Sequence, residues 1–340
     1  MSTDELARSS PSSAPADASL VDHGTVSSRR SINTSTARIH APKQSAFKHR
    51  LFDGMTFAVS FQGRQANGSN DQYAGKTEKA KAAIERMIRQ EGGQILDSGF
   101  NELFQFDPLS KAIAASTPVM SSSLKLLDQD TGFTALIADG HSRKVKYMQA
   151  LALGLPCLAP KWIEICVTKG ELVDWSSYLL CAGQSAILGE AIRSRNLQPY
   201  DPSMAKLAEV IDQRPKLLDG TQILLIMKAR QEDKRLPYVF LARLLGGSLV
   251  RVHTIEEARA KLLEREARGE PFDWVYVDDQ VHNAEEALFK PKGAGALPKK
   301  RKRHARGDDG DRPPKRIRTL NDELVIQSLI LGRLIEEGEM

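Results

Sequence analysis

Apolar positions along the chain form two series of short runs, and the second series repeats the order of the first. In the first series, residues 55–61 alternate large apolar with small or polar residues, which predicts a strand. Residues 77–91 place their apolar side chains on one helical stripe, which a glycine pair ends. Further strands are predicted at 94–96, 133–138 and 155–158, further helices at 142–153 and from Pro160 onward, and an inserted loop at 101–130.

The second series predicts strands at 223–227, 249–252 and 272–278 and helices at 236–245, 255–268, 284–289 and 322–336. Pro237 falls in the first turn of the first of these helices, where proline is tolerated. Between the two series, residues 185–196 are predicted to form a linker helix. Apolar strands joined by helices favour a parallel sheet that is covered on both faces. The predicted fold is therefore α/β, with two three-layer units in tandem, each a four-stranded parallel sheet flanked by helices, where the fourth strand of the second unit is expected only because that unit repeats the first.

The two units differ in the chemistry that they carry at matching offsets. The first unit has Ser60 at the end of its first strand and Lys146 in its second helix, whereas the second unit reaches Ile226 and Glu285. A hydroxyl group and an ammonium group can hold a phosphate, but an apolar side chain and a carboxylate cannot. The sequence therefore favours an anion site in the first unit only.

Composition narrows the class of protein. A length of 340 residues suits two domains with additional tails. Three cysteines without paired spacing argue for a reducing compartment and against a disulfide framework or a zinc site. The chain has no apolar run of membrane-spanning length and no secretory signal. Residues 1–48 are rich in serine and poor in large apolar residues, which predicts a disordered tail.

The positive charge of the chain comes from one short segment. Residues 299–318 contain ten Lys/Arg and three Asp, a balance of +7, so the other 320 residues sum to 5 − 7 = −2. The two basic clusters are typical of a bipartite nuclear localisation signal; they comprise Lys299, Lys300, Arg301, Lys302 and Arg303, and then Lys315 and Arg316. Weak, sequence-independent contact with nucleic acid is the alternative use.

Several of these residues carry a resemblance to a known family. Asp53-Gly54 precedes the first strand, Gly92-Gly93 follows the first helix, and Trp162 lies in the third helix. With the stretches 136–147 and 178–183, they resemble the tandem BRCT domains of DNA-damage checkpoint mediators, the family of the p53-binding protein one and its fungal checkpoint-adaptor relatives. The resemblance covers about residues 49–340 and is strongest over 49–185. One departure is Leu324, which stands where the second repeat would have a tryptophan.

The resemblance implies a domain organisation and a binding site. It implies a first BRCT repeat at 49–183, a linker at 184–216, and a second repeat at 217–340 with a basic, disordered insertion at about 291–318. In such tandems the first repeat binds a phosphoserine, and the matching residues are the Ser60 hydroxyl, the Phe61 main-chain N–H and the Lys146 ammonium. Arg143 matches the residue that contacts the peptide beyond the phosphoserine. A solvated, purely structural role is the alternative for each of these side chains.

The implied function is that of a nuclear checkpoint adaptor without catalytic activity, cofactor or metal. The ligand expected from the family is the phosphorylated C-terminal Ser-Gln tail of histone H2-A at DNA breaks, or another phosphoserine protein. Chromatin localisation, indirect contact with checkpoint kinases and homodimer formation are further expectations, and no membrane contact is expected. The alternative function is a phosphate-independent interaction scaffold in DNA repair. Catalysis is disfavoured because none of the common nucleotide-binding, hydrolase or metal-binding motifs occurs.

Overall fold

The computed structural model describes residues 50–62, 71–105, 124–214, 216–227, 232–277, 288, 317–336 and 339. At 71–74 and 232–235 it describes the helical backbone only. The tail predicted at 1–48 and most of the helix predicted at 284–289 therefore lie outside the described residues. The described residues of both repeats belong to one compact unit.

The first repeat is built on a four-stranded sheet in which every strand pair is parallel. Its strands are β1 (Thr56–Ser60), β2 (Gln94–Leu96), β5 (Thr134–Ala138) and β6 (Cys157–Leu158), in the order β2-β1-β5-β6. The four strands predicted from the apolar runs are confirmed. Because the strands run in the same direction, their carboxyl ends meet at one edge of the layer.

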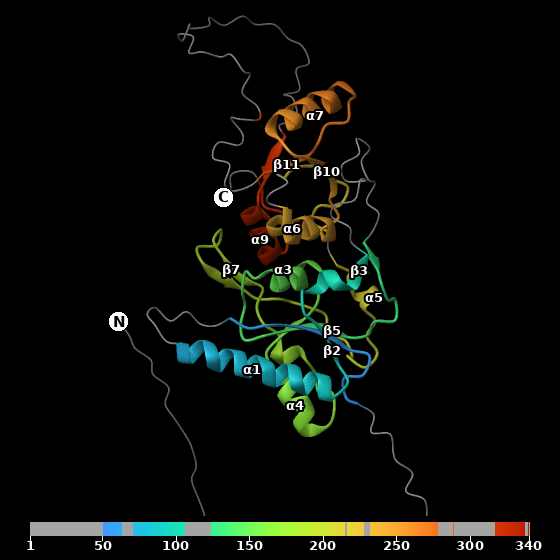
Figure 1. Cartoon of the computed structure of the whole chain (residues 1–340), viewed down its shortest axis with the longest axis vertical. Helices are drawn as coiled ribbons and strands as arrows, with labels where there is room; N and C mark the ends of the chain where they lie inside the picture. Colours follow the sequence, from blue (N-terminus) through green and yellow to red (C-terminus); the bar gives the residue numbers. More distant parts are fainter. Residues whose placement is uncertain are drawn as a thin grey trace, which may run out of the picture. The chain divides into compact units, whose positions relative to one another are not determined.

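Helices cover both faces of this sheet (Figure 1). On one face, α1 (Asp71–Gln90) and α4 (Lys161–Lys169) pack against Phe57 and Val59 of β1. Trp162 of α4 lies at the centre of that core, fully buried, with its ring 5.6 Å from that of Phe133. On the other face, α3 (Val145–Ala152) packs against Ala58, Leu136 and Ala138. Successive residues of a strand point to opposite faces, which explains this division.

Two predictions for the first repeat need correction. Helix α1 begins at Asp71, six residues before the predicted start at Thr77, because nothing between these positions breaks a helix except the tolerated Gly75. The predicted loop at 101–130 is in part ordered. It contains the 3₁₀ helix η1 (Phe100–Leu103) and an antiparallel pair of short strands, β3 (Phe104–Gln105) and β4 (Lys125–Leu126).

The second repeat has the same strand order on a second parallel sheet. The order is β10-β9-β11-β12, made by β9 (Gln222–Ile226), β10 (Ser248–Val252), β11 (Trp274–Tyr276) and β12 (Arg318–Leu320). Helices α6 (Glu232–Leu244) and α9 (Asp322–Leu331) pack on one face, and the charged helix α7 (Ile255–Ala267) packs on the other. Pro237 lies inside α6, not in its first turn, because that helix begins four residues earlier than predicted. Helix α9 ends at Leu331, earlier than predicted, because Gly332 adopts a left-handed backbone.

The linker helix predicted at 185–196 is wrong. After the 3₁₀ helix η2 (Ser176–Tyr178), the chain forms an antiparallel hairpin of β7 (Gly183–Ser185) and β8 (Ala191–Arg193). Gly189 and Glu190, at the tip, both have positive φ values, 61° and 66°, which reverse the chain and are incompatible with a continuing helix. The linker does contain a helix, α5 (Leu207–Asp212), which lies later in the sequence.

The two repeats share one apolar core. Side chains of α3 in the first repeat, α5 in the linker, and α6 and α9 in the second repeat belong to the same cluster of buried residues. Phe104 of the first repeat meets Phe240 of the second with their ring centroids 5.8 Å apart in an edge-to-face arrangement. Each repeat therefore buries part of its apolar surface against the other, in addition to a cluster of its own.

Candidate phosphate-binding site

Ser60 lies at the carboxyl end of β1 and is almost completely buried, with 7% of its surface exposed. It stands opposite Ala138 of β5, and both Ala58 and Ala138 face α3. The alternation of side chains along a strand places the Ser60 hydroxyl on the α3 side as well. Lys146 is the second residue of α3, at the same edge of the sheet. The two predicted phosphate ligands thus lie on the same face of the first sheet and at the same edge of it.

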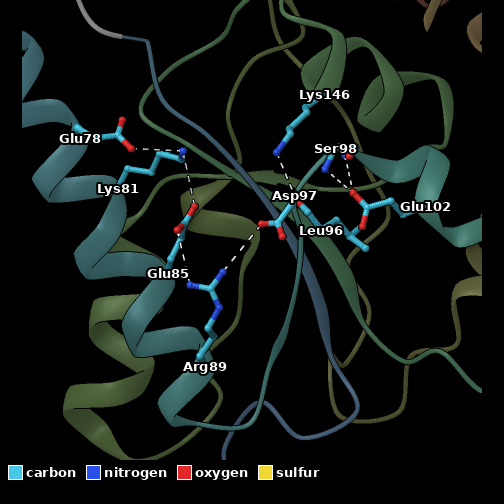
Figure 2. Close-up of polar contacts among 10 residues, drawn as sticks. Glu78, Lys81, Glu85, Arg89, Leu96, Asp97, Ser98, Glu102 and Lys146 are labelled. Carbon is cyan, nitrogen blue, oxygen red and sulfur yellow. Dashed lines mark hydrogen bonds and ion pairs between the residues drawn. The ribbon is translucent and has the colours of Figure 1, made fainter. Parts of the chain in front are cut away.

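Lys146 reaches the sheet edge, but it contacts another partner than Ser60. Its Nζ donates a hydrogen bond of 3.2 Å to the main-chain carbonyl of Leu96, at the end of β2 (Figure 2). Leu96 stands opposite Ala58, two residues before Ser60, so this anchor point lies about 7 Å short of Ser60 along the strand direction. The flexible lysine side chain must swing from Leu96 towards the end of β1 to reach a phosphate held by Ser60.

The environment of Lys146 makes its charge costly. Partial burial is the main cause that lowers the pKa of this lysine, and the positive charge of Lys81 on α1 adds to the effect. Lys81 itself is held by Glu78 at 3.6 Å and Glu85 at 3.8 Å (Figure 2). Among the carboxylates that the structure describes, none forms an ion pair with Lys146. The nearby carboxylates of Glu102, Asp97 and Glu85 act in the opposite direction but only partly offset the lowering. An anion bound directly to the partly desolvated ammonium group would stabilise its charged form further.

The segment after β1 is tied to the loop that leads into α3. Gln62 donates its main-chain N–H to Asp139 at 2.8 Å and its side-chain amide to the carbonyl of His141. Lys144 Nζ donates to the carbonyl of Phe61 at 2.6 Å. These bonds fix the half-buried Phe61, whose N–H is the third predicted phosphate ligand, next to the start of α3. The sequence did not indicate this role of Lys144.

Arg143 lies in the same loop, but it faces the second repeat. Its guanidinium group forms a hydrogen-bonded ion pair with Glu323, in the first turn of α9. Glu323 also accepts a hydrogen bond of 2.9 Å from the side chain of Gln327. Arg143 is thus placed at the junction between the repeats, where the resemblance implies peptide contact. Sequence reasoning missed Glu323 because acidic residues are common in the first turn of any helix.

The second repeat offers no equivalent hydroxyl group. Ile226 ends β9 as Ser60 ends β1. It packs with Val250 and Leu262 in the apolar cluster on the face of the second sheet that α7 covers. Glu285, the residue at the offset of Lys146, lies outside the described residues. A phosphate site in the first repeat only stays a prediction.

The predicted localisation signal lies outside the described residues, from Lys299 to Arg303 and at Lys315 and Arg316. The described residues resume at Ile317, and Arg318 belongs to β12, with its guanidinium carbon 5.6 Å from the centre of the Trp274 ring. The predicted end of the insertion, at about residue 318, therefore falls on the first residue of a strand. Within the described ranges, no group of His, Cys, Asp and Glu residues is arranged to hold a metal ion. The helices in those ranges are too short or too polar to cross a membrane.

Two curated proteins are similar to this chain in sequence. DNA repair protein crb2 of Schizosaccharomyces pombe (strain 972 / ATCC 24843) is 29% identical over 181 residues, which cover 50% of this chain and 22% of crb2. DNA repair protein RAD9 of Saccharomyces cerevisiae (strain ATCC 204508 / S288c) is 32% identical over 149 residues, which cover 38% of this chain and 11% of RAD9. The chain thus matches less than a quarter of the length of each relative. No protein-family model matches the chain.

Solved structures of BRCT domains also resemble the chain, at low TM-scores. The BRCT5-BRCT6 domains of S. pombe Brc1 match with a TM-score of 0.30 and 16% identity, covering 62% of this chain and 72% of theirs. The C-terminal BRCT domain of human XRCC1 matches with a TM-score of 0.21 and 14% identity, covering 38% of this chain and 92% of that domain. The fold rests on the sheet topology described above and not on these scores. This chain is therefore similar in sequence to two DNA repair proteins, crb2 and RAD9, and its described residues form two parallel four-stranded sheets of the same strand order, as the resemblance to tandem BRCT domains predicts.

Proposed function

We propose that this chain is a nuclear checkpoint adaptor whose first BRCT repeat binds a phosphoserine peptide. The observation that carries the proposal is the placement of Ser60 and Lys146 on one face and at one edge of the first sheet, with Ile226 at the matching strand end of the second. A hydroxyl donor and an ammonium group supply the charge-assisted hydrogen bonds that a phosphate needs. The phosphoserine tail of histone H2-A at DNA breaks is the ligand that we propose from the family.

The cellular role follows from this ligand. Binding to a phosphorylated histone tail would hold the adaptor on chromatin at DNA breaks, where it would support kinase signalling without catalysing a reaction itself. Both relatives are named DNA repair proteins, which is consistent with such a role. The basic segment would direct the chain to the nucleus and would add weak electrostatic attraction to nucleic acid.

Fluorescence anisotropy with two peptides tests the proposal. A labelled peptide ending in phosphoserine-Gln-Glu-Leu is titrated with the full chain, and the unphosphorylated peptide is its matched control. We expect binding of the phosphorylated peptide and at least a tenfold weaker affinity for the control, since one lost charged hydrogen bond already costs about 1.5–3 kcal/mol. Equal affinities would reject the phosphate site.

A phosphate-independent interaction scaffold is the second candidate. It is favoured by the hairpin of β7 and β8, where Leu188 is 47% exposed and Ile192 is 62% exposed. Exposed large apolar residues that lie close together can mark a protein interaction surface. In the same titration, this function would give peptide binding that does not depend on the phosphate, or no peptide binding at all.

A further inference from the structure

A chain of polar contacts connects Arg143 to the linker hairpin through the second repeat. Arg143 is paired with Glu323 Oε2, and Glu323 Oε1 accepts a hydrogen bond of 2.9 Å from Gln327 Nε2. Gln327 lies one helical turn further along α9 and is almost completely buried, with 2% of its surface exposed. Its Oε1 accepts a hydrogen bond of 3.2 Å from the main-chain N–H of Ala186, the residue that follows β7. The loop that carries Arg143 and the β7-β8 hairpin are thus both connected to α9, the first through Glu323 and the second through this buried amide.

The chemistry of the amide fixes the direction of the chain. A main-chain N–H can only donate, so the oxygen of the Gln327 amide must face Ala186. The amide is planar, and its NH₂ group is therefore turned towards Glu323. One carboxylate oxygen of Glu323 is occupied by this donor, which leaves the other oxygen for Arg143. Turning the amide over would leave buried donors facing each other, which is costly.

We propose that Gln327 is a positioning residue for Arg143 in peptide binding. It holds Glu323, and Glu323 holds the guanidinium group in the loop between Ser60 and the second repeat. Arg143 is thereby presented to the main-chain carbonyl or the terminal carboxylate of the residues that follow the phosphoserine. This inference rests on the proposed function, and it concerns only the part of the ligand beyond the phosphoserine.

Two phosphopeptides separate this role from a general effect on the fold. The long probe ends in phosphoserine-Gln-Glu-Leu, and the short probe ends at the phosphoserine itself as an amide. Gln327→Met keeps the length of the side chain and removes both polar ends. We expect this variant to bind the long probe about fivefold or more weakly, which is the scale of coupling within one hydrogen-bond network. Its affinity for the short probe should be unchanged.

The control variant is Ser328→Ala, which removes a neighbouring buried hydroxyl whose oxygen accepts a hydrogen bond from Ile335 at 3.3 Å. It should bind both probes as the unmodified chain does. In an Arg143→Gln background, Gln327→Met should cause no further loss, because the group that it positions is absent. Equal weakening of both probes, an equal loss in Ser328→Ala, or an additional loss in the Arg143→Gln background would overturn the inference.

The experiment also distinguishes this inference from the proposed function. If the unmodified chain does not prefer the phosphorylated long probe to its unphosphorylated form, the phosphate site itself is rejected. If that preference is present and Gln327→Met binds both probes normally, only the positioning role is rejected.

Discussion

At the scale of single residues, the candidate site depends on two side chains that arrive from different elements. Ser60 comes from the end of β1 and Lys146 from the first turn of α3, and both lie at the edge where the parallel strands end. The serine is nearly buried next to alanine neighbours, whereas the lysine is half-buried and bound to a single carbonyl. Changes to either residue should therefore affect ligand binding more than folding.

Ser60→Ala should weaken binding of the phosphorylated peptide by about 1–3 kcal/mol, the usual cost of a lost hydrogen bond to a charged group. Lys146→Glu should abolish binding, because a carboxylate would repel the phosphate. Both are measured by anisotropy, with the melting temperature of each variant recorded in parallel. Lys161→Glu, an equal charge change on exposed α4, is the control and should bind normally. A collapse of the melting temperature in Lys146→Glu would show that this lysine is structural.

The lowered pKa of Lys146 predicts a pH profile for binding. The phosphate becomes a dianion above its second pKa of about 6, so affinity should rise through that range. At high pH, Lys146 should lose its proton earlier than an exposed lysine would, because burial and the charge of Lys81 disfavour its charged form. Affinity should then fall as the ammonium group is lost.

Lys146→Arg is the matched control for this profile, because arginine stays protonated throughout the accessible range. The affinity of the Lys146→Arg variant for the phosphopeptide should therefore stay constant at the high pH values where the affinity of the unmodified chain falls. Anisotropy titrations at a series of pH values measure both proteins. Identical alkaline limbs in the two proteins would assign the loss to a group other than Lys146.

The residues of the site could be predicted from sequence only in part. Comparing the two repeats singled out Ser60 and Lys146, because a matching offset is visible without coordinates. The pair of Arg143 and Glu323 joins residues that are 180 positions apart, and no local pattern connects them. The contact of Lys146 with the Leu96 carbonyl was equally invisible, since every residue has a carbonyl group. The chemical groups at a position can be predicted from a sequence, whereas contacts between residues brought together by tertiary packing cannot.

At the scale of elements, the linker hairpin depends on its turn. Gly189 has a φ of 61°, and a Cβ added there would meet no atom within 4 Å. The cost of a substitution is therefore conformational and not steric. Gly189→Ala should destabilise the protein by about 1–2 kcal/mol, the penalty of a left-handed backbone for a residue with a side chain.

Gly140→Ala is the control for this prediction. Its added Cβ also meets nothing within 4 Å, and its φ lies outside the left-handed range. The substitution should be neutral or slightly stabilising, because alanine restricts the unfolded chain. Denaturant unfolding measures both variants. A Gly189→Ala protein as stable as the unmodified chain would mean that the turn adapts without strain.

Helices and strands were predicted well where they contain a continuous run or regular pattern of apolar residues. They were predicted poorly where a few turn residues decide the structure. All four strands of the first sheet were found, because each is an apolar run between polar segments. The stretch 185–196 was misread as a helix, since the left-handed backbone at Gly189 and Glu190 leaves little trace in the hydrophobic pattern. Helix starts were displaced by several residues at α1 and α6 because permissive residues precede the expected starts.

At the scale of the whole molecule, the shared core predicts that the two repeats unfold together. Phe240 of α6 is buried against Phe104 of the first repeat. Phe240→Ala should cost about 3–5 kcal/mol, the usual range for truncating a buried phenylalanine. Leu263→Ala, at a position that is 67% exposed, is the control and should change stability by less than about 0.5 kcal/mol.

Tryptophan fluorescence can follow the unfolding of the first repeat separately from the unfolding of the whole chain. Two of the three tryptophans, Trp162 and Trp175, lie in the core of the first repeat, and Trp274 lies in β11 of the second. In a Trp274→Phe background, the remaining signal reports the first repeat alone. Phe240→Ala should shift that signal to lower denaturant together with the circular dichroism of the whole chain. Separate transitions would show that the repeats fold independently.

The dependence of α3 on α9 has a consequence for truncated alleles. Helix α9 supplies Val325, Ile326, Leu329 and Ile330 to the core that also holds Tyr147 and Met148 of α3. A nonsense mutation shortly before Asp322 would leave the first repeat intact in sequence and yet remove the packing partner of the helix that carries Lys146. Such an allele should lose phosphopeptide binding, although every residue that we propose as a phosphate ligand would still be translated.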